Sequence, residues 1–491
     1  MTPAPSRQAI YLRYLGINAT FIIPALVLLL LPRLLKVRSS ELAGHWSYGA
    51  QLGNIFAGAT AGFGMIAARA ANQRGGGRVV DSLEQVVAAL TIGLLAVLVI
   101  LTAPPFVMLP WPAAVAFATA LSIPLGQVAL AHSAAHDTVR NVAAKVAIFR
   151  AVPVLVALGL SALLISRTIL PVANLVSATL WLILAALALW RFPVRLDRLR
   201  DVPRSLLAEL AGLGVQSGLN TWIVVSAGLF LRWASKGRGS SMLSLDDYVS
   251  TSAVISAGIQ VQSLSGQLQA PLVVLFARDP ITTPSGQILL GRMFRLGARA
   301  NFLAVLAFMW GCHLVLSRIY NFGSAPLVLR QILWLGVGTY LRLCLTPLAN
   351  GVLSSSRSQS FIPILAIEAI VAALIGGAGL WFGIPQLIAA VPFVDALVCW
   401  LANCLLLGRA GFQGAITQIC SDRILLLELA AGASVLAATS LCLAHRQIGI
   451  AAMLAVVGGG YAVTRLGLEL KWMLRARRLA REGADPAAGA A

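Results

Sequence analysis

Long apolar runs separated by short polar gaps constrain this chain more than any other feature of its sequence. A helix that crosses a bilayer needs about 20 mostly apolar residues, and it satisfies its own backbone hydrogen bonds in lipid. Runs of that length recur along most of the chain. We predict about fourteen transmembrane helices, at 14–32, 44–68, 83–102, 111–134, 142–165, 168–190, 206–231, 248–277, 294–317, 326–350, 360–381, 384–407, 424–443 and 447–470.

The composition excludes a soluble protein. Hydrophobic residues make up 59% of the 491 positions, and only 11% are charged. A soluble domain carries about twice that share of charge. The net charge of +20 does not indicate nucleic acid, because Lys and Arg sit mostly in gaps where they orient helices and meet anionic lipid headgroups. We expect an all-α polytopic membrane protein whose partners include membrane lipids and no nucleic acid.

The basic residues also predict which gaps face the cytosol. The central segment Arg191–Arg204 holds five arginines between two apolar runs. With the N-terminus inside, this segment and most other basic gaps fall on the same side, as the positive-inside rule requires. Both termini are then cytosolic. The outer gaps are too short to form a folded domain.

Short internal repeats divide the chain into related halves. Lys36-x-Arg38-x-Ser40, followed by Tyr48, returns 200 residues later as Lys236-x-Arg238-x-Ser240 and Tyr248. Similar pairs occur at 16–18 with 218–220, and at 124–131 with 347–354. Because these matches fall at corresponding helices, we expect two pseudo-symmetric six-helix lobes related by an axis along the membrane normal. The predicted domains are an N-terminal lobe (1–190), a cytosolic basic linker (191–205), a C-terminal lobe (206–410), two added transmembrane helices (411–473) and a cytosolic tail (474–491).

The second predicted helix carries a resemblance to a known family. Its residues Trp46–Ala71 (WSYGAQLGNIFAGATAGFGMIAARAA) resemble the polysaccharide transporters of the MOP flippase superfamily, which are related to lipid II flippases. The short turns at 130–145 and 348–363 resemble that family as well. The resemblance implies a bacterial inner-membrane protein that moves a polyprenyl-diphosphate-linked oligosaccharide to the outer leaflet by alternating access, driven by H⁺, Na⁺ or the membrane potential. The polysaccharide and lipid II branches both remain open.

The same resemblance implies a central cavity lined by the first two helices of each lobe. Basic groups there could bind a diphosphate through charge-assisted hydrogen bonds. The alternative is that the arginines anchor helix ends and the amides link helices. The candidate cavity residues are Arg13, Asn18, Gln51, Asn54, Arg69, Asn220, Gln260, Gln267, Arg342 and Asn350.

Three charged residues fall near the middle of predicted spans. Arg342, Glu368 and Asp395 each lie roughly 13–18 Å from the cytosolic ends of their helices, counted at about 1.5 Å per residue. A charge at that depth costs several kcal/mol unless it is paired, so each is a candidate for function. One interpretation is a structural ion-pair cluster within the second lobe. The other is that Glu368 or Asp395 takes up the coupling ion.

No motif indicates a cofactor, a metal site or an enzyme. Gly75-Gly76-Gly77 lacks the Lys-Ser/Thr of a phosphate-binding loop, and His132 with His136 has no third ligand nearby in sequence. A cation-coupled multidrug exporter of the same superfamily is an alternative function that would favour an acidic cavity. A membrane-embedded polysaccharide polymerase or ligase would need a large outer loop, and the longest outer gap, 232–247, is too short.

Overall fold

The computed structural model describes residues 36, 39–71, 113, 204–236, 242–269, 272, 276, 279–322, 325–355 and 358–482. Within these residues the chain is helical throughout, with short turns and no strand. The predicted helices at 14–32, 83–102, 142–165 and 168–190 lie outside the described residues, and so does nearly all of 111–134 and of the linker 191–205. The fold is therefore described mainly for the C-terminal half of the chain, together with α3.

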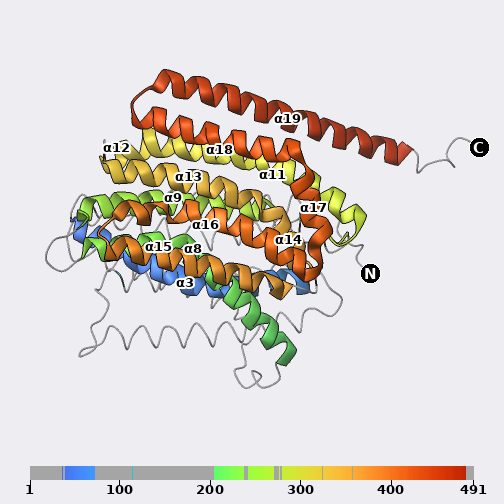
Figure 1. The fold of residues 1–491 in the computed structure, drawn as a ribbon, viewed down its shortest axis with the longest axis horizontal. Coiled ribbons are helices and arrows are strands. Elements are labelled where there is room, and N and C mark those ends of the chain that lie inside the picture. The colour runs from blue at the N-terminus through green and yellow to red at the C-terminus, as the bar shows by residue number, and fades with distance from the viewer. Residues whose placement is uncertain are drawn as a thin grey trace, which may run out of the picture.

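Nine long helices form the described region of the fold (Figure 1). They are α3 (Ser40–Ala71), α8 (Arg204–Ser235), α9 (Leu245–Gln269), α11 (Pro284–Trp310), α13 (Pro326–Cys344), α15 (Ile362–Trp381), α16 (Pro385–Ala402), α18 (Arg423–Ala444) and α19 (Ile448–Glu482). Short helical segments connect or extend them: η2 (Gly311–Leu316), α12 (Ser317–Tyr320), α14 (Thr346–Leu353), η3 (Ser358–Phe361), η4 (Asn403–Phe412) and α17 (Gln413–Ser421).

Every span predicted from residue 206 onward overlaps one of these helices, although some ends differ. α11 begins at Pro284, ten residues before the predicted start, because Thr283 caps the helix and Pro284 fits its first turn. The helix predicted to end at 407 continues through η4 and α17 to Ser421, with a kink at Gly411 where φ is 93°. Apolar runs define where a helix lies in lipid and do not define where it ends in water.

Seven stretches of the described residues are long and apolar enough to cross a bilayer, and they span 214–235, 284–320, 326–344, 359–381, 385–421, 423–444 and 448–469. Large apolar side chains are exposed on their outer surfaces, among them Trp381, Leu427 and Val456. Such surfaces are stable when they face lipid. The chain is a multi-pass integral membrane protein.

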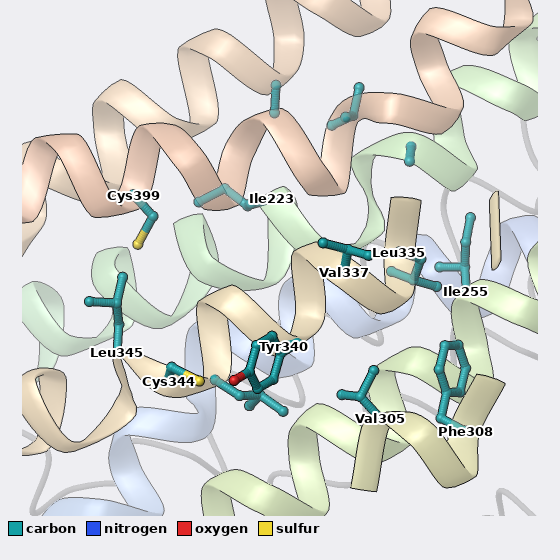
Figure 2. Close-up of a cluster of buried hydrophobic side chains, with 14 of the residues drawn as sticks. Ile223, Ile255, Val305, Phe308, Leu335, Val337, Tyr340, Cys344, Leu345 and Cys399 are labelled. Carbon is teal, nitrogen blue, oxygen red and sulfur yellow. The ribbon is translucent and has the colours of Figure 1, made fainter. Parts of the chain in front are cut away.

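The long helices lie side by side, with α3 and α8 toward one edge of the bundle and α18 and α19 at the opposite edge (Figure 1). α13 lies between them and packs against α9, α11, α16 and α18. Figure 2 shows a region of the buried core, in which Leu335, Val337, Tyr340 and Cys344 of α13 meet side chains of the neighbouring helices. α13 is therefore the central helix among those described.

Close backbone contact between α13 and α16 requires a glycine. A Cβ atom placed on Gly338 would overlap the carbonyl oxygen of Pro392 and lie 2.9 Å from the nitrogen of Phe393. Arg342 lies one helical turn after Gly338, and Asp395 lies about one turn after Pro392. This contact therefore determines how close the two charged side chains can approach.

We predict that Gly338→Ala lowers the free energy of unfolding by about 1–3 kcal/mol, because the added methyl group overpacks a contact between two backbones. Denaturant unfolding in detergent, followed by tryptophan fluorescence, measures this. Gly377→Ala is the matched control, since a Cβ at that position on α15 has no neighbour within 4 Å. Equal stabilities of the two variants would contradict the prediction.

Candidate functional site

The structure brings Arg342, Glu368 and Asp395 together from three helices. Nη2 of Arg342 on α13 lies 2.8 Å from Oε2 of Glu368 on α15. Nη1 of the same guanidinium pairs with Oδ2 of Asp395 on α16. Glu368 is 0% exposed and Asp395 is 2% exposed. We call these three residues the central charge cluster.

Asn220 connects α8 to the central charge cluster. Nη2 of Arg342 donates a hydrogen bond of 2.9 Å to Oδ1 of Asn220. Asn220 itself is exposed, whereas the two carboxylates behind Arg342 are buried. The guanidinium thus lies between a buried acidic pair and the exposed amide of α8.

The end of α13 favours a cation at this position. Arg342 lies in the last turn of α13, which stops at Cys344 before Thr346 and Pro347 begin α14. The carbonyl groups of a last helical turn carry partial negative charge and stabilise a nearby guanidinium. The helix break therefore places the end of one helix dipole inside the predicted span 326–350, about 9 Å from its cytosolic end at 1.5 Å per residue.

The charges of the cluster do not balance. Two carboxylates share one guanidinium in the ion pairs that these residues form. Oε1 of Glu368 and Oδ1 of Asp395 are also buried without a hydrogen-bond partner among the described residues. An uncompensated buried carboxylate is costly. Uptake of one proton or one small cation would remove the excess negative charge, and carboxylate and amide oxygens are suitable ligands for a hard cation.

The other polar candidates that the structure describes lie on α3, α9 and α14. Gln51 is buried on α3, and its Nε2 donates to Oγ of Ser252 at 3.3 Å. Asn54 on α3 and Gln260 on α9 are half-buried. Asn350 is buried on α14. These four residues are therefore distributed over three helices, whereas Asn220 accepts directly from Arg342 of the central charge cluster.

Four of the candidate residues are not tested by the structure. Arg13 and Asn18 lie outside the described residues. Arg69 and Gln267 belong to α3 and α9, but their side chains are not among those described. Their role in a cavity stays a prediction.

Sequence reasoning missed a second buried charge cluster, at the C-terminal helices. Arg299 of α11 binds Glu428 of α18, with Nη2–Oε1 at 2.9 Å, and its Nη1 lies 2.5 Å from Oε1 of Glu469 on α19. Tyr461 also donates to Glu428 at 2.7 Å. The positive-inside argument assigns Arg299 to a cytosolic gap, and it therefore overlooks this pairing. Glu368 was recognised as a candidate because it is an acidic residue inside an apolar run. The same signal would have identified Glu428.

Comparison with known proteins identifies no sequence family for this chain. No protein-family model matches it, and no curated protein matches it. Among solved structures, a MOP superfamily transporter from Pyrococcus furiosus Vc1 aligns with a TM-score of 0.45 and 13% identity, over 82% of this chain and 96% of that one. The description of that structure reports a binding pocket of reverse polarity.

Two further solved structures align at similar scores. A MATE protein in complex with MaL6 has a TM-score of 0.45 and 14% identity, over 84% of this chain and 99% of that one. A multidrug resistance MATE family transporter of the MOP superfamily, in an inward-facing conformation, has a TM-score of 0.46 and 14% identity, over 84% and 97%.

The unequal charges of the central cluster predict unequal effects of removing its members. Arg342→Met leaves two buried carboxylates without a cation, and we expect it to lower the free energy of unfolding by about 3–5 kcal/mol. Glu368→Gln leaves one balanced pair, so its effect should be below about 1 kcal/mol. Denaturant unfolding in detergent measures both values.

Arg330→Met is the control for this series, since Arg330 is exposed on the same helix. Adding Glu368→Gln and Asp395→Asn to Arg342→Met should restore some of the lost stability, because no buried charge then remains in the cluster. A triple variant less stable than Arg342→Met alone would contradict the charge-balance argument.

Proposed function

We propose that this chain is an ion-coupled secondary transporter of the MOP flippase superfamily. Its proposed substrate is a polyprenyl-diphosphate-linked oligosaccharide, carried from the cytosolic to the outer leaflet of the bacterial inner membrane by alternating access. The observation that carries the proposal is the central charge cluster, because a buried excess of one negative charge is a place where a coupling ion can bind. The sequence resemblance at Trp46–Ala71 and the internal repeats support the choice of superfamily.

The proposed coupling step is a change in the partners of Arg342. With both carboxylates ionised, the guanidinium is held on its buried side by Glu368 and Asp395. Protonation of one acid, or binding of Na⁺ between the two acids, neutralises part of the carboxylate charge and weakens the ion pairs of Arg342. Arg342 can then interact more strongly with Asn220, or with an anionic group next to α8, since it is a bidentate donor suited to phosphate. Ion uptake and substrate binding thereby influence each other.

The proposed movement is a rocking of the two predicted lobes against each other. In a transporter built from two related lobes, the substrate site lies between them and the lobes rock around it. α8 belongs to the predicted C-terminal lobe and contacts α3 of the predicted N-terminal lobe. Asn220 of α8 therefore lies on a helix that contacts both the charge cluster and the other lobe.

A cation-coupled exporter of cationic drugs in the same superfamily is the second candidate. The observation that favours it is the acidic excess of the central charge cluster, which would also attract a cationic substrate. A lipophilic cation and a lipid-linked diphosphate, offered separately to vesicles that contain the protein, distinguish the two functions, since each transporter should move only one of them.

Coupling through the acids predicts a specific loss of gradient dependence. In reconstituted vesicles, we expect Glu368→Gln or Asp395→Asn to abolish the stimulation of transport by an imposed H⁺ or Na⁺ gradient, because the neutral amide cannot exchange a proton or balance a cation. The comparison is transport with and without the gradient. Asp279→Asn, at an exposed acid in the turn before α11, is the control. Gradient stimulation that persists in both cluster variants would leave the cluster with a structural role alone.

The substrate assignment predicts where material accumulates when the protein is removed. Depletion in cells should trap lipid-linked sugars on the cytosolic leaflet, measured by their protection from an externally added sugar-modifying enzyme. Complementation with Arg69→Ala should fail although the protein inserts, if this cation binds the diphosphate. Arg342→Ala should fail as well, and measuring its stability separates the loss of diphosphate binding from the loss of the buried ion pairs. Arg423→Ala, at an exposed position that the charge pattern predicts to be cytosolic, should complement fully. An unchanged outer-leaflet pool after depletion would exclude this substrate.

A further inference from the structure

The predicted outer ends of α3, α8 and α9 are held together by a set of polar contacts that the proposed function does not use. Nζ of Lys36, which precedes α3, lies 3.9 Å from Oδ1 of Asp246 on α9. It also donates at 3.2 Å to Oγ of Ser250 and to the carbonyl oxygen of Tyr320. Ser40 at the start of α3 donates to Asp246 as well. Lys36 is thus bound to two segments of the predicted C-terminal lobe.

One turn deeper, a second layer joins α3 to α8. Nη2 of Arg232 lies 3.2 Å from Nδ1 of His45. Because a guanidinium can only donate, Nδ1 must accept, and the proton of a neutral ring is then on Nε2. That nitrogen lies 3.5 Å from Oε1 of Glu41. The guanidinium also lies 5.3 Å from the ring centre of Tyr248, so Arg232 is enclosed by groups from α3 and α9.

A third layer closes the interface below these charges. Gln51 is 3% exposed and donates to Ser252 of α9. It packs on Gly228 of α8, where a Cβ atom would lie 2.7 Å from its Cδ. Gly44 has the same role in the layer above, where a Cβ would lie 3.0 Å from Nη1 of Arg232. The two glycines let the helices approach closely enough for all three layers to form.

These contacts lie along one face of α3 and involve the repeat found in the sequence. Ser40, Glu41, His45 and Gln51 follow the spacing of a single helix face. Lys36 binds Asp246 and Ser250, which flank Tyr248, and Tyr248 is the repeat counterpart of Tyr48. The outer segment of one predicted lobe therefore binds the corresponding segment of the other.

We propose that the contacts of Lys36, Ser40 and His45 with Asp246 and Arg232 form an outer latch, whose release opens the molecule toward the outer leaflet. The structure then represents the state that is closed on that side. This inference rests on the proposed alternating access. Polar contacts of this kind can be replaced by contacts with water when the two segments separate, as a switch requires.

A buried reporter cysteine tests the latch. Ser252→Cys, in a variant whose six native cysteines are replaced, lies beneath the latch and is 1% exposed as serine. In vesicles with the outer face exposed, a membrane-impermeant maleimide should label it slowly. Lys36→Ala or Asp246→Ala should raise the labelling rate about fivefold each, the effect of one lost charged contact on a two-state equilibrium.

The charge swap keeps the test decisive if single variants are unstable. Lys36→Asp combined with Asp246→Lys restores the ion pair but not the hydrogen bonds to Tyr320 and from Ser40, so it should be labelled more slowly than either alanine variant. Arg446→Ala, at a predicted outer position in the α18–α19 turn, should not change the labelling rate. Unchanged labelling in Lys36→Ala and Asp246→Ala, or labelling of the swap as fast as that of the alanine variants, overturns the latch. Labelling reports opening and not export, so this result is independent of whether the proposed substrate is moved.

Discussion

The described structure depends on one interaction, the sharing of Arg342 between two buried carboxylates. In a low-dielectric interior neither acid nor the guanidinium can remain ionised alone, so the three helices that carry them must converge. Gly338 and Pro392 make that convergence sterically feasible, and the break after α13 directs a helix end toward the same place. Helix packing and electrostatics here require each other. A change in the ionisation of the acids therefore acts directly on the packing of the most central helix.

The second cluster shows why the first is the better candidate for ion uptake. Arg299 also meets two carboxylates, but Glu428 accepts from Tyr461 in addition to Arg299, and the side chain of Glu469 is 30% exposed. The hydrogen bond from Tyr461 and the partial exposure of Glu469 thus make the second carboxylate less costly here. Arg295 adds a further pair with Asp422 at 2.7 Å. These contacts attach α18 and α19 to α11, and they leave no buried carboxylate oxygen of Glu428 or Glu469 without a partner among the described residues.

The sequence predicted the described helices and the central charge cluster because both follow from the cost of exposing polar groups to lipid. A transmembrane span is recognised in the sequence by its length and hydropathy, and an acidic residue within it is recognised as an exception to the apolar pattern. The outer latch could not be predicted in this way. Lys36 and Arg232 are in or beside polar gaps, where a solvated side chain and a paired one look alike in sequence. The ion pairs of Arg299 could not be predicted for the same reason. The cavity assignments of Gln51, Asn54, Gln260 and Asn350 depended on a resemblance and stay predictions, whereas the contact of Asn220 with Arg342 is present in the structure.

The length of α19 has a mechanical consequence. The helix is held to the bundle through Glu469 and then continues to Glu482, a further distance of roughly 20 Å at about 1.5 Å per residue. α19 also packs on α11 and α18, and a tilt of the helix by about 10° at Glu469 would displace the far end by roughly 3–4 Å. Small rearrangements within the bundle are thereby converted into displacements at the membrane surface. The end of α19 is consequently a suitable position for a spectroscopic label that follows a tilt of the C-terminal helices.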